Sequence, residues 1–143
     1  MRALLDAGVL VALLDAQHAR HTEVWTWFEA DVERGWASCP LTQNGVLRIM
    51  SHPRYPNPVP VGDLLERLGD ACASSWHQFW VDDVSLVDPG RIAFSRVLSP
   101  RQLTDAHLLS LAVSHGGRLV TLDDRVQVTL VPDARPEHLS VLR

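Results

Sequence analysis

The chain has 143 residues, 46% of them hydrophobic, and a formal net charge of −4. This length fits one domain, residues 1–143, with a sizeable core, and the composition excludes a disordered chain, a collagen-like repeat and a disulfide-knotted miniprotein. The 13 basic residues are all arginine and are outnumbered by 17 acidic residues. Charge alone therefore does not make the chain a polycation that coats nucleic acid. Any phosphate contact must come from a local arginine cluster, or through metal ions held by acids.

Two features bear on where the chain acts. Cys39 and Cys72 are its only cysteines, which are too few for a disulfide framework and lack metal-ligand spacing, so we expect a reducing compartment. The apolar run over residues 7–14 is too short to span a bilayer and precedes no small-residue cleavage site. We therefore expect a cytoplasmic protein that does not enter a membrane.

The N-terminal half alternates short apolar runs with helical patterns. The apolar run that ends at Asp6 predicts a strand over residues 2–6, and Pro40 is well placed to open a helix. We expect a second strand over residues 36–39 and helices over residues 9–14, 22–34 and 41–50.

The C-terminal half continues this alternation. The four prolines within residues 51–60 predict a loop, and Thr104 is a suitable N-cap. We expect helices over 61–74, 91–97 and 105–115, a loop over 99–103, and strands over 78–81, 118–122, 126–131 and 138–142. The alternation predicts one α/β domain around a mostly parallel sheet.

Three acids are expected to meet at one edge of this sheet. Asp6 and Asp123 each follow an apolar strand, and ligand sites form where parallel strands end. Asp105 opens a helix that leads directly into the strand before Asp123, so it reaches the same edge. Each acid also has an ordinary interpretation: Asp6 as a helix cap, Asp105 as a first-turn acid, and Asp123 with Asp124 as a turn.

Clustered carboxylates repel one another unless a cation joins them. Oxygen ligands without a Cys–His set suit a hard ion, Mg²⁺ or Mn²⁺, which activates water for phosphodiester hydrolysis. Arg48 is expected near the same edge, where it contacts a phosphate or pairs with an acid. The pattern therefore favours a metal-dependent site for phosphate chemistry.

Three segments resemble the PIN-domain ribonucleases, specifically the VapC-type toxins of type II toxin–antitoxin modules. They are LLDAGVLVALLDAQHARH, CPLTQNGVLRIMSHPRY and LTDAHLLSLAVSHGGRLVTLDDRV. The resemblance implies an α/β/α sandwich in which about four acids hold Mg²⁺ or Mn²⁺. Its first, third and fourth acids fall on Asp6, Asp105 and Asp123, the catalytic and metal-binding candidates. Gln43, Arg48, Thr104 and Asp124 are secondary candidates.

Two positions depart from the family pattern. The usual polar residue two positions after the first acid is Gly8 here, and the usual second acid, a Glu, is Gln43. An amide can ligate a metal or bind its water, but it supplies no charge. The resemblance with these departures implies one metal, with a second recruited by substrate, and weak or narrowly substrate-dependent cleavage.

The leading hypothesis is an endoribonuclease toxin that cleaves structured RNA such as tRNA or rRNA and is neutralised by a VapB-type antitoxin. The resemblance further implies a homodimer, with the partner bound along the early helices near Val24, Trp25, Trp27 and Phe28. One alternative is a PIN-fold module that binds RNA or antitoxin without cleaving. The other is a phosphatase of the haloacid dehalogenase type, against which Gly8 and the absence of lysine argue.

Overall fold

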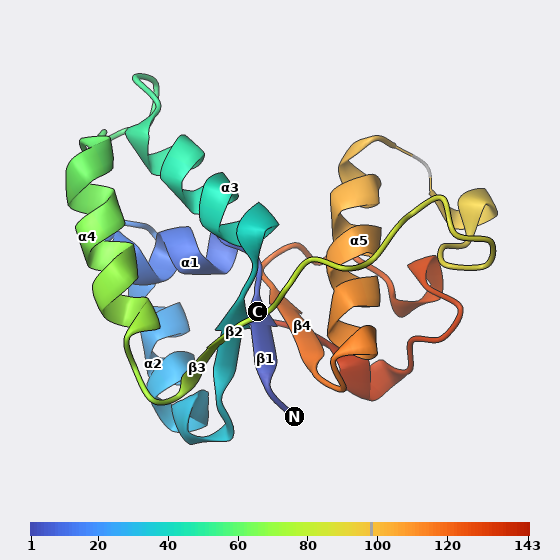
Figure 1. Ribbon diagram of the computed structural model, residues 1–143. Helices are drawn as coiled ribbons and strands as arrows, with labels where there is room; N and C mark the ends of the chain where they lie inside the picture. Colours follow the sequence, from blue (N-terminus) through green and yellow to red (C-terminus); the bar gives the residue numbers. More distant parts are fainter. Residues whose placement is uncertain (98) are drawn as a thin grey trace.

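The computed structural model describes residues 1–97 and 99–143 and is drawn in Figure 1. Its centre is a five-stranded sheet in the order β3-β2-β1-β4-β5, in which every pair of neighbours is parallel. The strands are β1 (Ala3–Leu5), β2 (Trp36–Ser38), β3 (His77–Phe79), β4 (Arg118–Thr121) and β5 (Leu139–Val141). The predicted mostly parallel sheet is confirmed.

Helices cover both faces of the sheet. Four of them lie on one face and α5 lies on the other, as Figure 1 shows. The helices are α1 (Ala7–Leu14), α2 (His21–Asp31), α3 (Pro40–Ser51), α4 (Val61–Cys72) and α5 (Arg101–Ser114). This arrangement is the α/β/α sandwich that the resemblance implies.

Alternation along the two central strands supplies both halves of the core. Leu4 and Leu119 point towards α5, whereas Leu5 and Val120 point towards the face covered by α1 to α4, and all four are buried. Strands buried on both faces are continuous apolar runs, which is why β1 and β4 were evident in the sequence.

Helix α5 begins a full turn earlier than the sequence predicts. Its first residue is Arg101, so the expected loop over 99–103 and the expected cap at Thr104 are wrong. Pro100 already has helical backbone angles, and the Gln102 side chain accepts a hydrogen bond from the Ser99 amide at 2.9 Å. Asp105 therefore lies in the second turn of α5, and its carboxylate is not a first-turn acid.

Two weaker predictions in the C-terminal half are also wrong. Residues 126–131 do not form a strand; they contain the 3-10 turn Val128–Leu130, and Val126 and Leu130 are buried against α5, four residues apart. The helix expected over 91–97 is reduced to the 3-10 turn Phe94–Arg96. The expected strand over 138–142 is confirmed as β5.

Helix α2 is also shorter than expected. It ends at Asp31 and is followed by the 3-10 turn Val32–Arg34, after which Gly35 takes φ 86° and turns the chain into β2. Within residues 1–97 and 99–143, no helix is both long enough and apolar enough to cross a membrane.

Candidate active site

The three acids singled out in the sequence lie around one cavity of about 220 Å³. Asp6 follows β1, Asp123 follows the last residue of β4 by two positions, and Asp105 projects from α5. The register between β1 and β4 pairs Leu5 with Val120, which brings the ends of the two strands together. Gly8, Arg101, Thr121 and Leu122 complete the lining.

Thr121 links two of the acids, and sequence reasoning missed it. This buried last residue of β4 donates a hydrogen bond from Oγ1 to Asp6 Oδ2 at 2.9 Å. The same oxygen accepts a hydrogen bond from the Asp123 amide at 3.1 Å. The sequence signal for Thr121 was its hydroxyl group within an apolar run that ends at Asp123.

Burial and mutual repulsion act on two of the carboxyl groups. Burial raises the pKa of Asp105 to about 6, with smaller contributions from the negative charges of Asp6 and Asp123. Burial also raises the pKa of Asp6, against the stabilising hydrogen bond from Thr121. The cavity thus concentrates negative charge that is incompletely compensated by the protein.

Asp123 is in the opposite electrostatic state. Arg125 donates two hydrogen bonds to it, from Nε to Oδ1 at 2.9 Å and from Nη2 to Oδ2 at 3.0 Å. These hydrogen bonds hold the pKa of the Asp123 carboxyl below its usual range. Neither Arg125 nor the cavity-lining Arg101 was singled out in the sequence, because their role depends on which acids surround them.

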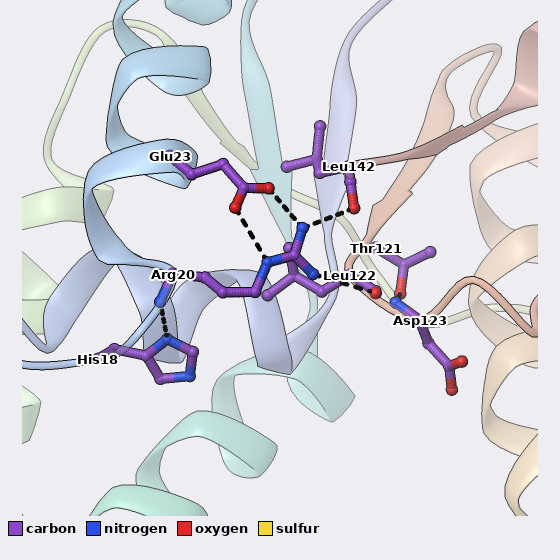
Figure 2. A network of polar contacts seen from close by, with 7 residues as sticks. All are labelled: His18, Arg20, Glu23, Thr121, Leu122, Asp123 and Leu142. Atoms are coloured by element: carbon purple, nitrogen blue, oxygen red, sulfur yellow. Dashed lines mark hydrogen bonds and ion pairs between the residues drawn. The ribbon is translucent and has the colours of Figure 1, made fainter.

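The loop between α1 and α2 fixes the backbone that carries Asp123. Arg20, on this loop, donates hydrogen bonds to the carbonyl oxygens of Leu122, at 3.5 Å, and Leu142, at 2.9 Å. Figure 2 shows these contacts. Glu23 binds the same guanidinium group. Arg20 therefore ties the ends of β4 and β5 to the N-terminus of α2, and it holds the segment after β4 in place.

Comparisons with known proteins identify the family. Ribonuclease VapC44 of Mycobacterium tuberculosis is 49% identical over 142 residues, which cover 99% of this chain and 100% of that protein. The chain belongs to the VapC family of PIN-domain ribonucleases. VapC38 of the same organism is 43% identical over 85% of this chain and 84% of its own length, and VapC39 is 36% identical over 86% and 89%. No family model matches the chain. Membership in this family removes the phosphatase alternative.

Gln43, at the position where VapC toxins typically carry their second acid, turns away from the acid cavity. Its Nε2 donates to Ser38 Oγ at 2.9 Å, and it is not among the described residues that line the cavity. Arg48 is exposed on the far half of α3, and Thr104 and Asp124 are exposed beside the acids. The structure thus brings together Asp6, Asp105 and Asp123, and leaves the four secondary candidates outside the lining.

Gln43 belongs instead to a neutral polar cluster of Ser38, Gln43, Cys72 and His77, here called the Ser38 cluster. His77 Nδ1 lies 3.0 Å from the carbonyl oxygen of Cys72, so this nitrogen donates and Nε2 accepts from Ser38 Oγ at 2.7 Å. Burial lowers the pKa of His77 and raises the pKa of the Cys72 thiol. Every member is therefore held in its neutral form.

The donors around the acid cavity suit a hard divalent cation. Asp6, Asp105 and Asp123 offer only carboxylate oxygens, and the raised pKa of Asp105 is a cost that a bound cation would remove. Across residues 1–97 and 99–143, no three His, Cys, Asp or Glu side chains are already placed to hold an ion. Magnesium typically takes one or two carboxylates and several waters, so the chemistry of the cavity fits such an ion.

Proposed function

We propose that this chain is a metal-dependent endoribonuclease, a toxin that hydrolyses phosphodiester bonds of structured RNA such as tRNA or rRNA. The observation that carries this proposal is the cavity at the ends of β1 and β4, where Asp6, Asp105 and Asp123 converge in a chain related to VapC ribonucleases along nearly its whole length. The names of those relatives support RNA as the substrate.

The three carboxylates would hold Mg²⁺ or Mn²⁺ at this cavity. When bound, the ion supplies a water activated for attack and offsets charge on the phosphate. Thr121 orients Asp6 through its hydrogen bond, and Arg101 brings a positive charge to the lining that attracts the RNA backbone. Asp105 must be ionised to bind the cation, so protons and the cation compete for its carboxylate.

The test is cleavage of unfractionated tRNA and of rRNA with Mg²⁺, with Mn²⁺ and with EDTA. We expect cleavage with either ion and none with EDTA, and Asp6→Asn should lower the rate about 100-fold or more, as loss of an essential group does. Asp133→Asn, an exposed acid outside the cavity, removes the same charge and should cleave like the wild type.

The same assay separates cleavage from binding alone. If the wild type binds these RNAs but cleaves none of them with any ion, the chain is the non-cleaving PIN-fold module instead. Neither binding nor cleavage would contradict both hypotheses for these substrates.

We also propose a VapB-type antitoxin whose apolar tail binds beside α2. A largely apolar cavity of about 340 Å³ lies there, with Trp25, Phe28, Trp36 and Trp76 in its lining. Trp25 is 43% exposed, so this face offers an aromatic ring to a partner, whereas Val24 is fully buried and is not part of a docking surface. An arginine of that tail would compete with the cation for the three acids, and a homodimer would carry two such sites.

Antitoxin binding should then weaken as Mg²⁺ rises at constant ionic strength, because the two ligands compete for the same carboxylates. Titration calorimetry measures this for the wild type and for Asp123→Asn, in which the dependence should shrink. An affinity indifferent to Mg²⁺ would mean that the tail inhibits by covering the RNA site. Sedimentation equilibrium tests the homodimer.

A further inference from the structure

Arg125 binds the carboxylate of Asp123, one of the three proposed metal ligands. Its side chain is 65% exposed and binds both oxygens of Asp123, and its own amide donates to Oδ1 at 2.9 Å. The amide contact closes a tight turn over residues 123–125, so the guanidinium group is tethered at the mouth of the acid cavity.

The contact between the two side chains is easy to exchange. An exposed ion pair contributes little stability, since water screens it and both side chains lose freedom. A divalent cation attracts the Asp123 carboxylate more strongly than a solvated guanidinium group does. An ion that enters the cavity and takes Asp123 therefore releases Arg125 at the site where the RNA phosphate arrives.

We propose that Arg125 binds Asp123 in the free enzyme and exchanges it for a phosphate of the RNA when the cation enters. This inference rests on the proposed nuclease function and adds a substrate-binding residue to it. The planar guanidinium fork that matches the two oxygens of a carboxylate matches two oxygens of a phosphate equally well. The short turn keeps Arg125 within a side-chain length of the ion ligand Asp123, and therefore beside the scissile phosphate.

The exchange makes a prediction that an ordinary surface ion pair does not. Removal of Arg125 should tighten metal binding, because the competitor is lost, and at the same time weaken RNA binding. We therefore compare Arg125→Gln with Arg34→Gln. Arg34 is 67% exposed in the turn before β2, at the opposite end of the strands from the acid cavity, and its loss changes the net charge equally.

The first measurement is Mn²⁺ affinity by calorimetry, without RNA. We expect Arg125→Gln to bind Mn²⁺ about two- to fivefold more tightly than the wild type, the size of an exposed charge pair. Arg34→Gln should stay close to the wild-type value. The second measurement is cleavage of unfractionated tRNA at saturating Mn²⁺, in which Arg125→Gln should raise KM about tenfold and change kcat less.

A conservative variant separates charge from the planar fork. Arg125→Lys retains one positive charge and should show a KM between those of the wild type and Arg125→Gln. Thermal unfolding should be unchanged in all three variants, because both side chains are exposed.

The outcomes distinguish this inference from the proposed function. A wild type that binds Mn²⁺ and cleaves tRNA, with unaltered Mn²⁺ affinity and KM in Arg125→Gln, would overturn the exchange and leave the nuclease in place. An equal change in Arg34→Gln would also overturn it, since net charge alone would then account for the effect. A wild type that neither binds Mn²⁺ nor cleaves would reject the function on which the inference rests.

Discussion

The acid cavity and the Ser38 cluster lie at neighbouring strands of one sheet, yet they are in opposite electrostatic states. In the cavity, burial and repulsion raise the pKa of Asp105 to about 6. Among the hydrogen bonds and ion pairs that the structure describes, no cationic side chain contacts Asp6 or Asp105. In the Ser38 cluster, the Ser38 hydroxyl both donates to His77 and accepts from Gln43.

This difference separates groups that a bound cation would stabilise from groups that complete the fold. A polar cluster whose donors and acceptors match stabilises the native state and needs nothing further. A cluster of like charges destabilises the unliganded protein and gains most from a cation. The four predictions that follow alter one side of this comparison at a time.

The largest effect is expected for Asp105→Asn. The folded pKa of Asp105 lies above the ordinary value of 3.8, so the native state holds this proton more tightly than the unfolded state. The stability that this proton gives the native state is therefore complete below about pH 4 and is lost as the pH rises through about 6. The variant should be about 1–2 kcal/mol more stable than the wild type at pH 7, after discounting for solvent. It should cleave RNA about 100-fold more slowly.

Urea unfolding in EDTA at pH 4 and at pH 7 measures this difference. The two proteins should differ little in stability at pH 4, where Asp105 is protonated in the native state and about half protonated in the unfolded state. A stability difference that is the same at both pH values would show that the carboxylate is not strained in the apo protein.

Ser38→Ala tests the Ser38 cluster, in which donors and acceptors are matched. The variant removes the acceptor of Gln43 and the donor to His77, and should lower the free energy of unfolding by about 1–2 kcal/mol while leaving metal affinity unchanged. Ser95→Ala, in the exposed turn Phe94–Arg96, is the matched control and should be neutral. Weakened Mn²⁺ binding in Ser38→Ala would join the cluster to the active site.

Thr121→Val preserves shape while removing the hydroxyl that links Asp6 to the Asp123 amide. Without the hydrogen bond from Thr121, the pKa of Asp6 should rise further, and cleavage at pH 7 should fall about tenfold. The acidic limb of the pH–rate profile should move to higher pH. A rate that drops equally at every pH would indicate a loss of structure instead.

The smallest effect is expected for Gln43→Glu. Because this side chain is directed at Ser38, its new charge should raise the pKa of His77, which NMR titration measures, and change Mn²⁺ affinity less than about twofold. A severalfold gain in Mn²⁺ affinity would show that position 43 can turn towards the acids and replace the missing charge.

The chain pattern predicted the centre of the sheet because strands β1, β2 and β4 are buried on both faces. Runs such as 118–122 have no polar alternation, and the sequence signal is therefore continuous. The pattern failed over 91–97 and 126–131, where Ile92, Val126 and Leu130 are buried in the same apolar cluster as α5. It also failed over 99–103, where α5 itself begins at Arg101. Burial there depends on the neighbouring helix, which leaves no periodic signal in the chain.

The sequence by itself determined the parallel α/β architecture and the three acids at its edge, because a strand followed at once by an acid fixes where that acid lies in a parallel sheet. Tertiary structure decided which other side chains reach the cavity. Thr121 and Arg101 line the cavity, Arg125 binds Asp123 at its mouth, and Gln43 turns away from it. Each of these outcomes depends on a partner in another element or on the direction of one side chain. Strand order positions a backbone, but only packing and electrostatics decide which way a side chain turns.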